Sequence, residues 1–142
     1  MHVKNELDMD VRPEATWTWL VRARLWPTWY SNSADVVIEG GGADLAAGAR
    51  FRWKTFGVTL DSKVEEFVPF ERLAWSAKAR GIDAYHAWLI EETGAGCHVS
   101  TEETQIGLLP RLSKALRPNH MREKHQEWIE GLLAKARTGP PP

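Results

Sequence analysis

The fold is decided by residues 73–105, which read LAWSAKARGIDAYHAWLIEETGAGCHVSTEETQ. Two glycine-containing turn signals, Arg80-Gly81 and the segment 93–96, divide this stretch into three runs rich in β-branched and aromatic residues. Runs of this kind, separated by short turns, are typical of consecutive antiparallel hairpins. The stretch therefore predicts three neighbouring strands of one antiparallel sheet.

The register of the first hairpin follows from the residues that a turn at 80–81 would bring together. This turn places Lys78 opposite Asp83 on one face, which is a favourable cross-strand charge pair. On the other face it places Trp75 opposite His86. The sequence thus predicts a charged outer face and an aromatic inner face for this hairpin.

The loop at 93–96 extends the same register to the third strand and places His86 beside Glu103. Because side chains alternate between the faces of a strand, a slip of one residue would turn the apolar Val99 outward and bring Glu102 inward. The position of Val99 favours the first alignment. We therefore predict that His86 and Glu103 are neighbours on an otherwise apolar inner face.

The rest of the chain supplies the other elements of the fold. The pattern predicts a strand at residues 2–10, helices at 13–22 and 25–30, a strand at 34–39, a hairpin turning at 56–57, and a final helix with an apolar stripe from Met121 to Ala136. Such a sheet can bury its inner face by curling around the last helix, which leaves a cleft between them. We predict one α+β domain over residues 1–138 and a disordered tail at 139–142.

Composition limits the classes of function. The chain has 142 residues and a net charge of −1, which gives no reason to expect nucleic acid or an anionic membrane surface as a partner. Cys97 is the sole cysteine, which excludes an intrachain disulfide and a cysteine-based zinc site. The charged N-terminus and the absence of a long apolar run predict a cytoplasmic protein without membrane insertion. The eight tryptophans indicate a core or cavity walled with aromatic rings.

Several short motifs carry a resemblance to a known family. They are Pro13-Glu14 with Trp17, Trp26-Pro27-x-Trp29-Tyr30, Gly48-x-x-Phe51-x-Trp53, Val64-x-Glu66-x-x-Pro69-x-x-x-Leu73-x-Trp75, His86-x-Trp88, and Glu102-Glu103-Thr104 before Gly107. With the order of elements, they resemble the SRPBCC superfamily, which includes START-type lipid-binding domains and bacterial polyketide cyclases. The resemblance, over about residues 3–137, implies a helix-grip fold. In that fold a curved antiparallel sheet of about seven strands wraps around a long C-terminal helix, with two short helices after the first strand and a deep hydrophobic cavity.

Members of this superfamily range from carriers to enzymes, so the fold leaves the activity open. We predict binding of a small hydrophobic molecule, aromatic or polyketide-like, in an internal cavity. Cyclisation or dehydration is the enzymatic version, with His86 as a proton shuttle and Glu103 as its partner. The alternatives are a non-catalytic carrier or sensor of lipid-like ligands and a co-chaperone-like interaction module. The predicted ligand-binding residues are Phe51, Trp53, Leu60, Trp75, Trp88, Thr101, His125, Trp128 and Tyr30.

The polar residues of this predicted cavity also have simpler interpretations. His86 and Glu103 can form a buried pair that satisfies its own hydrogen bonds or anchors the polar end of a ligand. A zinc or iron site made with His125 would need three convergent side chains, so we expect neither a metal nor a cofactor. We expect Trp26, Trp29 and Tyr30 near the cavity mouth, as a lid or a plug. The chain is expected to be a monomer or a homodimer.

Overall fold

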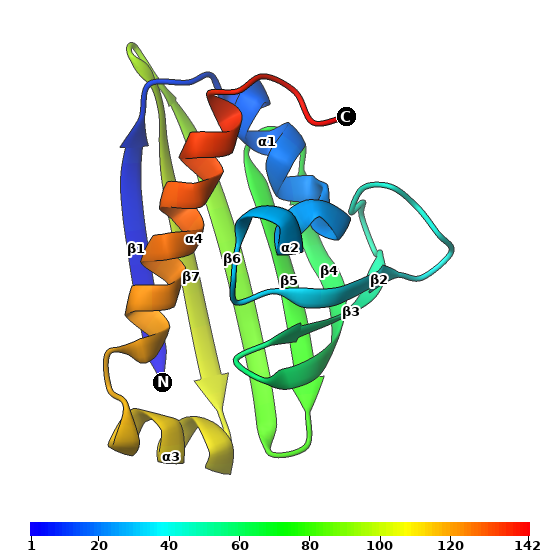
Figure 1. Ribbon diagram of the computed structural model, residues 1–142, viewed down its shortest axis with the longest axis vertical. Helices are drawn as coiled ribbons and strands as arrows, with labels where there is room; N and C mark the ends of the chain where they lie inside the picture. The colour runs from blue at the N-terminus through cyan, green and yellow to red at the C-terminus, as the bar shows by residue number, and fades with distance from the viewer.

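One curved antiparallel sheet wraps around the C-terminal helix in the computed structural model, which describes residues 1–142 (Figure 1). The seven strands lie in the order β1-β7-β6-β5-β4-β3-β2. Along the chain the elements are β1 (His2–Met9), α1 (Pro13–Val21), a 3₁₀ turn (Ala23–Leu25), α2 (Trp26–Trp29), β2 (Ala34–Ile38), β3 (Arg50–Thr55), β4 (Val58–Val68), β5 (Arg72–Ala79), β6 (Ile82–Thr93), β7 (Gly96–Ile106), α3 (Leu108–Leu116) and α4 (His120–Ala136). The predicted α+β helix-grip fold is confirmed.

The strands pair in the predicted register. Lys78 lies opposite Asp83, and His86 lies opposite both Trp75 on β5 and Glu103 on β7. On β3, every second side chain is buried, because period-2 alternation sends the aromatic residues inward and the basic ones outward. A register shift in β4 between Val64 and Glu66 marks a bulge, a feature that bends and twists a strand locally.

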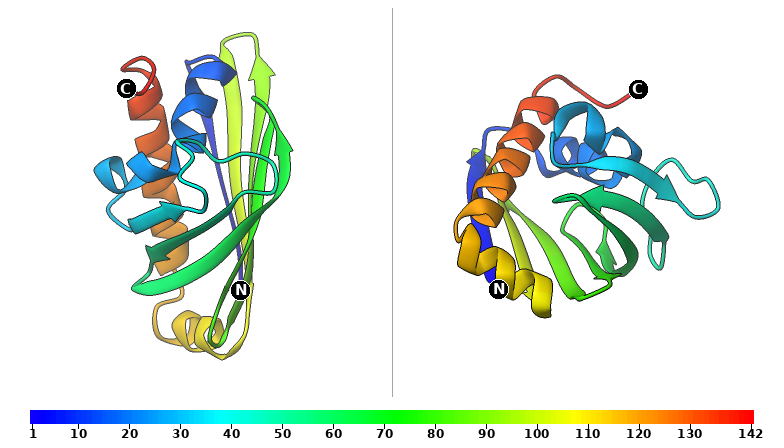
Figure 2. Two further views of the ribbon diagram at one scale, coloured as in Figure 1. Left: turned by 90° about the vertical axis from the view of Figure 1, so that its right-hand side faces the viewer. Right: turned by 60° about the horizontal axis from the view of Figure 1, so that its bottom comes forward.

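The concave face of the sheet is covered by helices from both ends of the chain. Helix α4 lies along β1 and β7, and α1 and α2 lie beside it, all on the same side of the sheet (Figure 2). The buried residues of α4 recur at helical spacing, as the sequence predicts for an amphipathic helix: Met121, His125, Trp128, Ile129, Leu132 and Ala136. This face of α4 points into the curve of the sheet.

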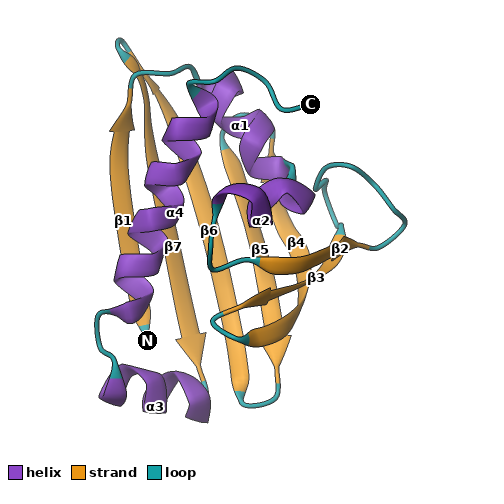
Figure 3. Ribbon diagram, in the orientation of Figure 1, coloured by secondary structure: helices purple, strands orange, loops and turns teal.

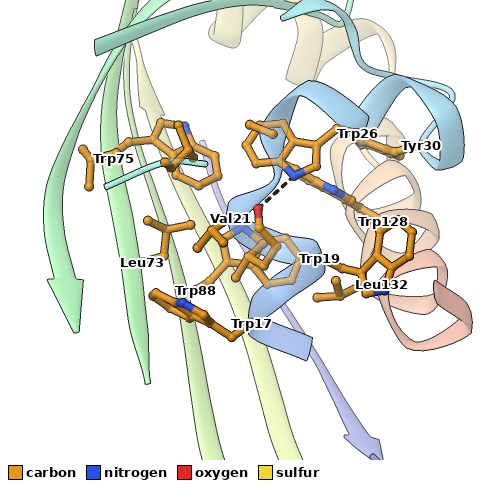
Figure 4. Packing of buried hydrophobic residues seen from close by; sticks show 14 of the residues in the cluster. Trp17, Trp19, Val21, Trp26, Tyr30, Leu73, Trp75, Trp88, Trp128 and Leu132 are labelled. Atoms are coloured by element: carbon orange, nitrogen blue, oxygen red, sulfur yellow. Dashed lines mark hydrogen bonds between the residues drawn. The ribbon is translucent and has the colours of Figure 1, made fainter. Parts of the chain in front are cut away.

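Trp26 occupies the centre of the space between these layers (Figure 4). Its ring contacts those of Trp53 and Trp128 at centroid distances of 5.2 Å each, and that of Trp75 at 5.6 Å. Its indole N–H donates a hydrogen bond to the Leu20 carbonyl oxygen at 3.0 Å. Trp26 is wholly buried among other rings, so the predicted position at a cavity mouth is wrong for this residue.

Two segments differ from the sequence-based expectations. Residues 108–116 form a helix, α3, which lies across the ends of β6 and β7 below the start of α4 (Figure 3). We did not predict it from the sequence, and Pro110 is compatible with it because in the first turn of a helix proline removes no hydrogen bond. The segment 139–142, expected to be a disordered tail, lies against α1. There the Trp19 indole donates to the Gly139 carbonyl at 2.7 Å and Arg22 donates to the Pro142 carbonyl.

The close approach of β7 to the end of β1 generates a testable prediction. A Cβ at Gly96 would collide with the Met9 carbonyl oxygen and lie 2.8 Å from that of Val11, both backbone atoms. We expect Gly96→Ala to lower the free energy of unfolding by about 2 kcal/mol or more, because the two chain segments must separate. Gly94→Ala in the same turn meets no atom within 4 Å and is the matched control. Urea denaturation should place the control within about 0.5 kcal/mol of the wild type, and equal losses would contradict this explanation.

Candidate functional site

A polar cluster lies inside the aromatic core, and His86 is at its centre. The ring of His86 stacks on those of Trp75 and Trp88, at centroid distances of 4.8 and 5.9 Å and interplanar angles of 21° and 9°. Its Nδ1 is 3.2 Å from Oε1 of Glu103, and its Nε2 is 2.6 Å from Oγ1 of Thr101. The predicted contact between His86 and Glu103 is therefore present, and both side chains are buried.

Glu103 connects His86 to the last helix. Its Oε2 lies 3.5 Å from Nε2 of His125 on α4 and accepts a hydrogen bond of 3.0 Å from the Gln105 amide. Burial raises the pKa of Glu103, but the hydrogen bond and charge of His86, with the charge of His125 and the Gln105 hydrogen bond, outweigh it. The pKa of Glu103 is therefore lowered overall, which favours a carboxylate in the core. Burial lowers the pKa of His125 to about 4, although Glu103 acts in the opposite direction.

The same three residues are the ones that could hold a metal ion. One ligand atom each of His86, Glu103 and His125 lies within 4.8 Å of the others, and imidazole with carboxylate suits zinc or iron. However, both ring nitrogens of His86 already lie within hydrogen-bond distance of protein groups. A hydrogen-bonded network accounts for this geometry without a metal, because each buried charge has a partner.

A pocket of about 260 Å³ lies between α3 and the ends of the strands. Eight of its twelve lining residues are hydrophobic, and the lining residues are Thr55, Phe56, Val58, Leu60, Ile82, Gln105, Leu109, Pro110, Leu112, Ser113, Leu116 and Met121. Its volume is slightly below the range of about 300–1,000 Å³ that is usual for ligand sites. A mainly apolar wall with a few polar groups is also usual for such sites.

The inner wall of this pocket contacts the polar cluster. Gln105 lines the pocket and also donates the hydrogen bond to Glu103. Phe56 lines it as well, and its ring packs edge-on against that of His125 at 6.2 Å. The Nδ1 atom of His125 is buried without a hydrogen-bond partner. A single layer of side chains, which includes Gln105 and Phe56, thus separates the pocket from the polar cluster.

The structure separates most of the predicted ligand-binding residues from this pocket. Leu60 alone among the nine lines it. The other eight are buried in the core, where the aromatic members pack ring against ring: Phe51, Trp53, Trp75, Trp88, Thr101, His125, Trp128 and Tyr30. Their role in binding stays a prediction, as do catalytic roles for His86 and Glu103.

Sequence reasoning missed the pocket wall that α3 supplies. A signal was present in the spacing of Leu109, Leu112 and Leu116, which recur on one side of a helix. We assigned no element to this run, which contains Pro110 and ends at Pro118.

Comparison with known proteins places the chain in a family. The family described as "Polyketide cyclase / dehydrase and lipid transport" matches residues 1–137. The chain belongs to this family. The polyketide cyclase/dehydrase assignment confirms the resemblance found in the motifs and supports a ligand-binding domain. No curated protein matches the sequence.

Solved structures of similar proteins share the polyketide cyclase/dehydrase fold over nearly the whole chain. A hypothetical protein from Helicobacter pylori is 31% identical, with a TM-score of 0.85 over 96% of this chain and 88% of that one. The protein TTHA0849 from Thermus thermophilus is 16% identical, with a TM-score of 0.77 over 97% and 98%. The di-domain ARO/CYC StfQ of the steffimycin biosynthetic pathway is 15% identical, with a TM-score of 0.79. It aligns with 96% of this chain, which spans 51% of StfQ. For TTHA0849 and StfQ, which are 16% and 15% identical, the similarity shows a shared fold.

The lowered pKa of His125 predicts how stability depends on pH. Its ordinary value is 6.5 and its folded value about 4, so between these values the unfolded chain binds more protons than the folded one. Stability should therefore fall as the pH falls, by about 2 kcal/mol between pH 7 and pH 5 from this group. Glu103 adds a further loss only at lower pH, as its carboxylate becomes protonated.

Urea titrations of the wild type and of His125→Gln over this pH range measure the effect. The variant should lose most of the slope between pH 7 and pH 5, and its stability at pH 8, where His125 is neutral in both states, sets the baseline for comparison. Equal slopes in the two proteins would show that another group is responsible.

Proposed function

We propose that this protein binds a small hydrophobic molecule in the pocket beneath α3. The observation that carries the proposal is the pocket wall, with eight hydrophobic residues of twelve in a space of about 260 Å³. Transfer of an apolar ligand from water to such a wall is favourable by about 25 cal/mol per Å² of apolar surface buried. Membership of the polyketide cyclase/dehydrase and lipid transport family supports a ligand of this chemistry.

The polar end of the ligand would lie toward Gln105 and His125. The Gln105 side chain is half-buried, and its amide nitrogen already donates to Glu103, which fixes its orientation. The ring of His125, whose Nδ1 has no hydrogen-bond partner, packs against Phe56, which lines the pocket. A ligand with one hydroxyl, carbonyl or carboxyl group on an apolar body fits this arrangement of groups.

Binding without chemistry is the function that this geometry supports best. His86 and Glu103 are 1% and 4% exposed, and neither lines the pocket. A proton donor must come within hydrogen-bond reach of the atom it protonates. With Gln105 and Phe56 between pocket and cluster, the cluster can orient Gln105 and polarise the inner end of the pocket without contacting the ligand.

Filling the pocket tests the location of the site. Ser113 lines the pocket from α3, and Ala115 is an exposed residue of the same helix that does not. We expect Ser113→Trp to weaken binding of the fluorescent aromatic probe 1-anilinonaphthalene-8-sulfonate at least about tenfold, which is about 1.4 kcal/mol. Ala115→Trp adds the same ring outside the pocket and should bind the probe like the wild type.

Native mass spectrometry of freshly purified protein provides the second measurement. A ligand retained by the wild type and by Ala115→Trp should be absent from Ser113→Trp. Equal probe binding and equal ligand retention by both variants would place the binding site elsewhere.

Acid–base catalysis is the second candidate function, and the 3.2 Å contact of His86 with Glu103 favours it. A carboxylate beside an imidazole orients the ring and supports proton transfer. If chemistry occurs, wild-type and His86→Gln proteins from the same host should carry different compounds, because glutamine keeps a hydrogen-bonding group but shuttles no proton at neutral pH. Non-catalytic carriage predicts identical compounds by mass spectrometry, and this is the result we expect.

A further inference from the structure

Five of the nine exposed large hydrophobic side chains of the protein lie in one short segment, residues 106–116. Within α3, Leu108 is 75% exposed, Leu112 53% and Leu116 71%. These leucines repeat every fourth residue, so they fall within about 80° of one another around the helix. Pro110 is the sole buried residue of α3. An apolar stripe that is left uncovered in this way marks an interaction surface.

The charge around this stripe is strongly basic. Residues 107–124 contain five lysines and arginines and one acidic residue, in a chain whose net charge is −1. Arg111, Lys114 and Arg117 are exposed and form no ion pair with acidic groups of the protein, whereas Lys124 pairs with Glu127 at 3.2 Å. Lys114 lies on the side of α3 opposite the leucines, and Arg111 flanks the stripe about 60° from Leu108, since each residue turns the helix by about 100°.

We propose that α3 docks on the surface of an anionic lipid bilayer. A helix with leucines on one side and basic residues on the other lies in the plane of the membrane interface, with its apolar side in the boundary between headgroups and acyl chains. Its basic residues are attracted by anionic headgroups. The unpaired cations of α3 therefore favour a bilayer over an uncharged protein groove as the partner of this stripe.

The helices of this protein are consistent with a position on the bilayer surface. None of them combines the length and the hydropathy that are needed to cross a membrane. The attachment is peripheral and relies on charge as well as on apolar contact. It should therefore be reversible and should weaken as salt screens the charges.

The same helix forms one wall of the pocket, which connects docking to ligand exchange. Leu109, Leu112 and Leu116 line the pocket and are also 42–71% exposed. Insertion of these side chains into the bilayer would remove them from the pocket wall and open it toward the lipid. This step rests on the proposed function and makes the ligand a lipid-like molecule taken from, or delivered to, the membrane.

Vesicle flotation of the full chain tests the docking. The wild type should float with vesicles of phosphatidylcholine mixed with phosphatidylserine, and much less with phosphatidylcholine alone.

Leu108→Glu changes an exposed leucine that does not line the pocket and should weaken binding at least about tenfold. Replacing Arg111, Lys114 and Arg117 together by glutamine should weaken it roughly a hundredfold, because each basic residue near an anionic surface contributes several-fold. Val37→Glu, at a residue 63% exposed on β2, is the matched control and should bind like the wild type.

Three results would overturn the proposal. In the first, the wild type does not float with anionic vesicles. In the second, Leu108→Glu and the triple glutamine variant both float as well as the wild type. In the third, sedimentation shows a dimer that Leu108→Glu dissociates while neither protein floats, which would make a second copy of the chain the occupant of the stripe. Probe binding measured without vesicles separates this proposal from the pocket, since either can fail while the other holds.

Discussion

The packing of Trp26 against rings from three other elements is the interaction on which the rest of the structure depends. Trp26 comes from α2, and its ring meets Trp53 of β3, Trp75 of β5 and Trp128 of α4 at 5.2–5.6 Å. Aromatic pairs of this geometry contribute about 0.5–1.5 kcal/mol each beyond the surface that they bury. One side chain thus joins α2 and α4 to the sheet, and it occupies the space where we predicted an internal cavity from the sequence.

This central packing explains why the pocket lies at one end of the molecule. Where the rings meet, the concave face of the sheet is occupied by side chains of the protein itself. Toward α3 the tryptophans end, and smaller residues such as Val58 and Ile82 leave the space that α3 covers. The polar cluster lies between these two regions. His86 and Glu103 stay together because a buried carboxylate is tolerated only with charged or hydrogen-bonding partners.

How far the sequence could predict this arrangement depended on the physical signal at each position. Register was predictable because a one-residue slip would have exchanged Val99 for Glu102 on the inner face, an error with a large energetic cost. The contact of His86 with Glu103 followed directly from that register. What could not be predicted was which inward-facing residues contact a ligand and which contact each other. That depends on how far α2 extends into the space between the sheet and α4. No periodicity in the sequence indicates that Trp26 is buried at the centre of this space.

Helix α3 was missed although the spacing of its leucines indicated a helix, and it changes how the charge of the protein should be interpreted. A net charge of −1 suggests no attraction to anionic surfaces, but net charge sums over all directions, whereas a membrane meets one end of the molecule at a time. At the α3 end, Arg111, Lys114 and Arg117 lie in or directly after the helix that carries the exposed leucines. Charge and apolar surface therefore act on the same partner there. A helix with only Pro110 buried gives up little packing when it moves from the pocket to another apolar environment, so we expect the element that closes the pocket to be readily displaced from it.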